Sequence, residues 1–126
     1  MSDPKDIVIC NPKRTAVGRY GGAFVGVPVQ ELAATVVKAV IEDAGISGQV
    51  IDDIILGQAS PNGAAPALGR VVGLDAELGV DVPGMQLDRR CGSGLQAIAT
   101  AAAHVAAGAA DLIIAGGAES MSNTEY

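Results

Sequence analysis

Residues 85–97 have the sequence MQLDRRCGSGLQA, and this stretch decides how the chain is expected to fold. Its first three residues are a short, mainly apolar run that is typical of a buried strand. At Gly92 or Ser93 the pattern changes to an alanine-rich segment that predicts a long helix. A strand that passes through a short glycine-containing turn into a helix indicates an α/β unit.

The same alternation extends along the rest of the chain. Further strands are predicted at residues 7–10, 54–56 and 112–115, and helices at residues 30–44, 67–73 and 92–107. Continuous apolar strands separated by helices are typical of parallel strands with both faces covered. We therefore predict an α/β fold, a layered arrangement with a mainly parallel sheet covered by helices.

Residues 112–115 are apolar throughout, so we expect their strand to lie inside the sheet and not at its edge. A repeating βα pattern would continue beyond that strand, but the sequence stops at Tyr126. The fold is therefore expected to be incomplete in this chain.

The composition limits the classes of function. A chain of 126 residues predicts one domain, and with 49% hydrophobic but only 2% aromatic residues the core must consist of small aliphatic side chains. The net charge of −6 without a basic stripe argues against a nucleic-acid partner. No uninterrupted apolar stretch has the length of a membrane span, and no secretory signal is evident. We expect a cytoplasmic protein whose two cysteines need not pair.

Cys91 is the candidate catalytic residue, because it directly precedes the predicted helix. Unsatisfied N–H groups and the positive end of the helix dipole meet at such a terminus, and both favour a thiolate over a thiol. Arg89 and Arg90 would add positive potential if they point inward. The small residues from Gly92 to Gly94 leave room for an acyl group, and their N–H groups could hold an oxyanion.

Both cysteines also have a purely structural interpretation, since free cysteines are commonly small core residues. For Cys91, the glycine-flanked position between strand and helix favours the reactive interpretation. Cys10 lies inside an apolar run with no helix terminus nearby, so we expect a buried structural thiol there.

A rival motif occupies the same turn. Gly92, Gly94 and Ala97 fit the G-x-G-x-x-G/A fingerprint of dinucleotide-binding sites, and Glu119 could then bind a ribose. However, the polar residues before Cys91 stand where that turn is usually tight and apolar. A lone fingerprint is weak evidence, so this site is the lesser alternative.

The residues alone do not supply a general base or a metal site. His104, the one histidine, follows Cys91 by 13 positions (91 to 104), or roughly 20 Å along a helix axis. That is beyond hydrogen-bond reach of the thiol. No cluster of histidine, cysteine or carboxylate residues has the spacing of metal ligands.

Five segments carry a family resemblance that spans nearly the whole chain. They are RTAVGRYGG at residues 14–22, ELAA at 31–34, VIDDIILG at 50–57, CGSGLQA at 91–97 and GGAESMS at 116–122. Together they resemble the thiolase family, in the group of acetyl-CoA acetyltransferases and 3-ketoacyl-CoA thiolases. The chain is thus identified as the N-terminal portion of the thiolase N-terminal domain over residues 1–126, and its sheet as part of a thiolase-like fold.

The resemblance implies an activity. Cys91 matches the residue that is acylated during reversible Claisen condensation, in which two acetyl-CoA molecules give acetoacetyl-CoA and coenzyme A, or during thiolysis of a 3-ketoacyl-CoA. Coenzyme A thioesters would be substrates, and no cofactor would be bound by this segment. Thiolases are homodimers or homotetramers, with the third predicted strand and the Ser-Met-Ser stretch near the subunit contact. The same assembly and a role in fatty acid metabolism are implied here.

The sequence also departs from the family. Thiolases are much longer, and their later part carries the activating histidine, a second catalytic cysteine and the loops that hold coenzyme A. Only Cys91 can be carried over, so the chain is expected to need the remainder of the thiolase polypeptide and to be inactive alone. The Arg89-Arg90 pair leaves the acyl-chain preference open.

Two alternatives within the same fold differ in chemistry. The first is a decarboxylating condensing enzyme of the ketoacyl synthase type, against which the GGAESMS segment at residues 116–122 argues. The second is a catalytically empty thiolase-like domain that acts only in dimerisation or partner binding. The presence of Cys91 with its glycines argues against this second alternative.

Overall fold

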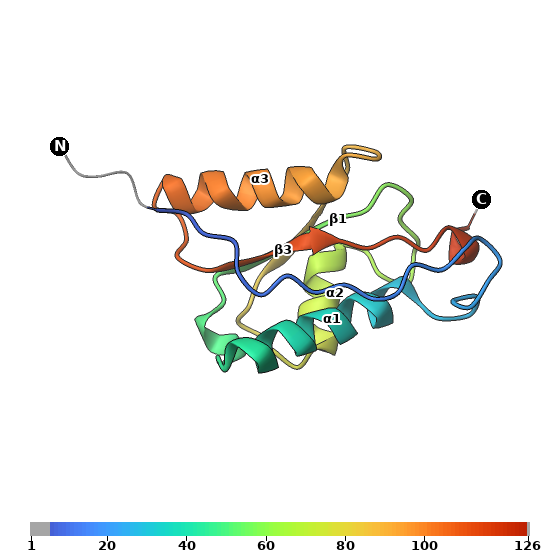
Figure 1. The fold of residues 1–126 in the computed structure, drawn as a ribbon, viewed down its shortest axis with the longest axis horizontal. Helices are drawn as coiled ribbons and strands as arrows, with labels where there is room; N and C mark the ends of the chain where they lie inside the picture. The colour runs from blue at the N-terminus through green and yellow to red at the C-terminus, as the bar shows by residue number, and fades with distance from the viewer. Residues whose placement is uncertain (1–5, 126) are drawn as a thin grey trace.

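The computed structural model describes residues 6–125 and has one parallel sheet with helices on both of its faces (Figure 1). The sheet has three strands in the order β2-β1-β3. In chain order the elements are α1 (Val29–Ala44), the 3-10 turn η1 (Gly48–Val50), β1 (Asp53–Gly57), α2 (Leu68–Asp75), β2 (Gly84–Leu87), α3 (Ser93–Ala106), β3 (Ile113–Gly117) and the 3-10 turn η2 (Met121–Asn123). The α/β prediction is confirmed.

The central strand β1 defines the two layers. Its side chains alternate between the faces of the sheet, as successive residues of a strand do. Ile54 and Leu56 pack in the cluster formed with α1 and α2, whereas Ile55 packs with Ala97 and Ala101 of α3. Both Ile54 and Ile55 have 0% exposure, so the core lies directly above and below β1.

The helix ends follow from the glycines that the sequence places there. α1 ends at Ala44, and Gly45 adopts the left-handed conformation with φ 64°, which favours a residue without a Cβ. Its N–H donates to the carbonyl of Glu42. Gly108, with φ 76°, similarly follows the end of α3. The predicted bounds of these two helices agree with the structure to within one or two residues.

The predicted strand at residues 7–10 is wrong. These residues form irregular chain, drawn in blue in Figure 1, and Val8 and Ile9 are each 76% exposed. Cys10 is exposed as well, so it is not a buried structural thiol. The physical reason is that a strand exists only through its ladder, and no strand of the described part of the chain pairs with this run. An apolar run indicates that a segment favours burial, but it does not say what covers it.

The position predicted for the last strand is also wrong. β3 pairs only with β1 and therefore lies at an edge of this sheet, opposite β2. Its apolar composition has another cause, because its two faces are both covered. Ile114 packs against the cluster of α1 and α2, and Ile113 and Ala115 pack against that of α3.

Asn123 ties the end of the described chain to the loop before α1. Its Nδ2 donates to the carbonyl oxygens of Phe24 (3.3 Å) and Val27 (3.0 Å), and its Oδ1 accepts the N–H of Gly26 (3.1 Å). Figure 1 shows the loop and the red turn η2 side by side. The Oγ of Ser122 also accepts the N–H of Gly21 at 2.8 Å, so two neighbouring side chains of η2 hold the glycine-rich loop.

Within residues 6–125, no helix has the length and apolar character that crossing a membrane requires.

Asp52 fixes the entry to the central strand. Its Oδ2 accepts the backbone N–H groups of Asp111 (2.7 Å) and Leu112 (3.0 Å), and its own N–H donates to the carbonyl of Leu112 (2.9 Å). These bonds to the charged form, that from Asp111 first, lower the pKa of Asp52 below its ordinary 3.8. The carboxylate thus joins the starts of β1 and β3.

We predict that Asp52→Asn makes stability less dependent on pH in the acid range. Because the folded-state pKa of Asp52 is lowered, its ionised form stabilises the fold at all pH values above 3.8, and this contribution is lost as the pH falls through the lower folded-state pKa. Thermal midpoints should therefore show a gap between wild type and variant near pH 6 that narrows as the pH falls below 3.8. Asp81→Asn, at an exposed carboxylate, is the control. A gap of constant size would contradict the prediction.

Candidate active site

Cys91 lies in a hollow at the carboxyl ends of the parallel strands, where open α/β sheets bind their ligands. The hollow has a volume of about 320 Å³. Residues at or beyond the ends of all three strands form it: Gly57, Arg90, Cys91, Ser93, Gly94, Gly117, Ala118 and Glu119. The structure thus brings the predicted nucleophile together with Glu119 and with the last residues of β1 and β3, Gly57 and Gly117.

The floor of the hollow depends on a close approach of α3 to the sheet. A Cβ at Gly57 would overlap the backbone of Ser93, and one at Gly117 would lie 3.0 Å from the carbonyl oxygen of Gly57. Gly94 differs, because a Cβ there would meet no atom within 4 Å. Glycine at position 57 is therefore required for contact between the strand and the helix, whereas Gly94 faces open space.

A strained turn presents Cys91. Arg90 has φ 50°, in the left-handed region that residues with a Cβ adopt at a cost of order 1 kcal/mol. Asp88 stabilises this conformation, since its Oδ1 accepts the N–H of Arg90 at 2.8 Å. Its Oδ2 forms an ion pair with the Arg90 guanidinium at 3.0 Å. The carboxylate of Asp88 therefore holds both the backbone and the side chain of Arg90, the residue before Cys91.

Ser93 closes the same turn from the helix side. This residue is only 4% exposed, and its Oγ accepts the N–H of Arg89 (2.8 Å) and donates to the carbonyl of Arg90 (2.6 Å). The N–H groups of Gly92 and Ser93 donate to the carbonyls of Arg89 and Arg90. The expectation that these two N–H groups would be available to an oxyanion is therefore wrong: they hold the turn together.

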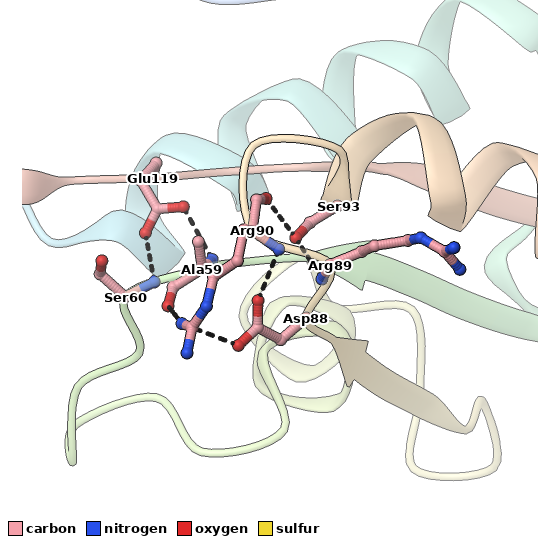
Figure 2. A network of polar contacts seen from close by, with 7 residues as sticks. All are labelled: Ala59, Ser60, Asp88, Arg89, Arg90, Ser93 and Glu119. Atoms are coloured by element: carbon pink, nitrogen blue, oxygen red, sulfur yellow. Dashed lines mark hydrogen bonds and ion pairs between the residues drawn. The ribbon is translucent and has the colours of Figure 1, made fainter.

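The two arginines point in different directions (Figure 2). Arg89 extends along α3, where its Nη1 donates to Gln96 at 3.0 Å, so only Arg90 lines the hollow. The Cys91 thiol is exposed. The side chain of Arg90 is 79% exposed and paired with Asp88, which reduces the positive potential that it adds near the thiol.

Glu119 reaches across the hollow from the end of β3 to the loop after β1. Its Oε2 accepts the N–H of Ala59 and its Oε1 accepts that of Ser60, each at 2.9 Å. Bonds from two N–H groups to a carboxylate are charge-assisted and set its direction. Glu119 is thus engaged with a neighbouring loop, an arrangement that the ribose-binding interpretation does not include.

The described residues place no histidine beside Cys91 and hold no metal cluster. His104 is in the last turn of α3, and Cys91 precedes the first turn of that helix. Within residues 6–125, no group of three or more histidine, cysteine or carboxylate side chains could bind a metal ion.

Comparison with known proteins assigns the chain to a family. The family model for the thiolase N-terminal domain matches residues 7–126. The chain belongs to the thiolase family. This result confirms the resemblance found in the sequence.

Related thiolases are similar along nearly all of this chain. The acetyl-CoA acetyltransferase of Cupriavidus necator is 40% identical over 117 residues, which are 93% of this chain and 30% of that protein. The beta-ketoadipyl-CoA thiolase of Pseudomonas putida is 40% identical over 124 residues, 97% of this chain and 31% of that protein. The crystal structure of the Bacillus anthracis acetyl-CoA acetyltransferase superimposes with a TM-score of 0.83 and 33% identity, covering 86% of this chain and 28% of that one. The chain spans about 30% of the length of the thiolases it matches.

Sequence reasoning found Cys91 but missed the side chains that hold its turn in this thiolase. Asp88 carried a signal, because aspartate commonly accepts the N–H two residues ahead in a turn. Ser93 is in the expected glycine-flanked stretch, but its burial depends on Gly57. Glu119 carried no local signal, since its partner Ala59 is 60 positions away in the sequence.

We predict that adding one methyl group has opposite effects at two glycines of the hollow. Gly57→Ala should lower the free energy of unfolding by about 1–3 kcal/mol, because the methyl group would overlap Ser93. Gly94→Ala should leave it unchanged or raise it by up to about 1 kcal/mol, because alanine favours the helix and meets no atom. Urea unfolding of both variants measures the difference. Equal destabilisation by both would show that α3 does not approach the sheet as described.

Proposed function

We propose that this chain supplies the nucleophile of a thiolase-type acyltransferase, with the Cys91 thiolate accepting an acyl group from a coenzyme A thioester. One observation carries the proposal: an exposed thiol lies beside the N-terminus of α3, inside a hollow at the carboxyl ends of parallel strands. Membership of the thiolase family supports the same chemistry.

In the degradative direction, the thiolate attacks the 3-keto carbon of a 3-ketoacyl-CoA. A thioester bond to the sulfur of Cys91 forms as the bond between C2 and C3 of the substrate breaks. The electron pair of that bond remains on C2, which takes up a proton and leaves as acetyl-CoA. The thiol of a second coenzyme A loses its proton, attacks the acyl-enzyme and restores the Cys91 thiolate. Condensation of two acetyl-CoA molecules to acetoacetyl-CoA and coenzyme A is the reverse sequence, and the covalent intermediate divides one difficult step into two.

The open space beside Gly94 supports an acyl group on Cys91, because no atom lies within 4 Å of a Cβ built there. The N–H of Gly94 belongs to the first turn of α3, where backbone donors lack intrahelical partners, and we propose it as the donor to the developing oxyanion. It takes the role that Gly92 and Ser93 cannot take, since their N–H groups hold the turn.

Proton transfer needs a group from outside this chain. His104 is at the far end of α3, and Glu119, a carboxylate that lines the hollow, accepts two backbone N–H groups. We propose that the remainder of the thiolase polypeptide supplies the base and the binding surface for coenzyme A, so this chain alone has no turnover. Assembly as a homodimer or homotetramer, a place in fatty acid metabolism and a cytoplasmic location stay predictions.

We predict that iodoacetamide alkylates Cys91 faster than Cys10 at neutral pH, by roughly tenfold or more, because Cys91 lies beside the N-terminus of α3 and its unpaired N–H groups, whereas Cys10 lies in irregular chain. Both thiols are exposed, so access alone does not distinguish them. Peptide mass spectrometry after timed quenching measures each rate in the same sample. In concentrated urea the two rates should converge, which is the internal control.

Two outcomes would contradict parts of the proposal. Equal alkylation rates in the folded chain would remove the case for a preorganised nucleophile and would favour a catalytically empty thiolase-like domain that acts in dimerisation or partner binding. Thiolysis of acetoacetyl-CoA by the purified chain would show that no group from outside is needed.

A further inference from the structure

The loop after β1 is held from two sides at one residue, Ala59 (Figure 2). The N–H of Ala59 donates to Oε2 of Glu119 at 2.9 Å, and its carbonyl oxygen accepts Nη1 of Arg90 at 3.1 Å. Glu119 follows β3, and Arg90 directly precedes Cys91. The two residues therefore meet through the backbone of a third segment, although neither is bonded to the other in the described structure.

Each partner is itself fixed in direction. The second carboxylate oxygen of Glu119 accepts the N–H of Ser60 at 2.9 Å, so its two bonds to adjacent N–H groups leave the carboxylate little freedom. The guanidinium of Arg90 also pairs with Asp88 at 3.0 Å, and Asp88 holds the backbone N–H of Arg90. A continuous set of polar contacts thus runs from Glu119 through Ala59 and Arg90 to Asp88.

This arrangement bears on the strained turn before the nucleophile. A left-handed residue with a Cβ persists only when its surroundings fix it, and Arg90 is such a residue. Its surroundings here are Asp88 and Ser93, which bond to its backbone, and the Ala59 carbonyl, which accepts its guanidinium. The position of that carbonyl in turn depends on Glu119, because the half-buried Ala59 and Ser60 both donate their N–H groups to its carboxylate.

We propose that Glu119 is a positioning residue for Cys91, acting through the Ala59 peptide on the left-handed turn at Arg90. The inference rests on the role proposed for Cys91. Glu119 need not touch the acyl group or exchange a proton. It fixes the backbone of Ala59, whose carbonyl oxygen accepts the guanidinium of Arg90.

The experiment compares Glu119→Ala and the milder Glu119→Gln, which keeps one acceptor oxygen, in the chain as it exists. Glu42→Gln, at an exposed glutamate of α1 beyond the opposite face of the sheet, is the matched control. Amide hydrogen exchange followed by NMR is the first readout. In Glu119→Ala the amides of Ala59 and Ser60 should exchange about tenfold faster, and so should those of Arg90 and Gly92 in the turn. Glu119→Gln should give a smaller change, and Glu42→Gln none.

A double-mutant cycle with Arg90→Ala then tests the route of the coupling. If both side chains act through Ala59, Glu119→Ala should lower the ratio of Cys91 to Cys10 alkylation by about threefold to tenfold in the wild-type background. In the Arg90→Ala background it should lower that ratio by less than about twofold. Equal effects in the two backgrounds, with an unchanged thermal midpoint, would overturn the proposal.

The two readouts separate this inference from the proposed function. If Cys91 is no more reactive than Cys10 in the wild type, the nucleophile proposal fails, yet faster exchange at Arg90 and Gly92 in Glu119→Ala would still establish the positioning contact. If Glu119→Ala speeds amide exchange only at Ala59 and Ser60, Glu119 holds the loop after β1 but not the turn at Arg90. The inference is then overturned, whatever the alkylation rate of Cys91. Loss of the fold in Glu119→Ala would move the test to Glu119→Gln, in which the same four amides are compared.

Discussion

The contact between Gly57 and the backbone of Ser93 is the constraint on which the rest of this structure depends. It brings the first turn of α3 onto the carboxyl end of the central strand, closer than any residue with a Cβ would allow. Ser93 is buried as a result, and its hydroxyl can close the turn that precedes the helix. The thiol of Cys91 is consequently presented at the sheet's end and not along the helix. The absence of a Cβ at Gly57 therefore determines where the thiol of Cys91 lies.

Around that contact the site is organised by polar side chains that bond mainly to backbone groups. Asp88 holds an N–H and a guanidinium, Ser93 holds an N–H and a carbonyl, and Glu119 holds two N–H groups. Such bonds fix the path of the chain while the thiol stays accessible. Asp88 and Ser93 thus stabilise the turn, while Cys91, in the same turn, keeps its thiol exposed. The strain at Arg90 is maintained by neighbours that do not contact the reacting atom.

Local signals accounted for what the sequence predicted correctly. Helical periodicity and the glycines at positions 45 and 108 located α1 and α3, and the strand-to-helix junction located Cys91. The failures concern relations between distant segments. Residues 7–10 have the composition of a strand but no pairing partner within residues 6–125, and β3 has the composition of a central strand because its faces, not its edges, are covered. Neither the left-handed conformation of Arg90 nor the reach of Glu119 to Ala59 has a signature in neighbouring residues.

The tie made by Asn123 has a consequence for the order of events during synthesis. Its partners in the loop, from Phe24 to Val27, precede it by nearly a hundred positions, so they leave the ribosome long before it. At about 5–20 residues per second, the loop waits roughly 5–20 s for the side chain that fixes it. Closing so long a segment also carries an entropic cost that local contacts do not. The glycine-rich loop is therefore among the last parts of the chain to become ordered, after the strands and helices between the two ends have formed their layers.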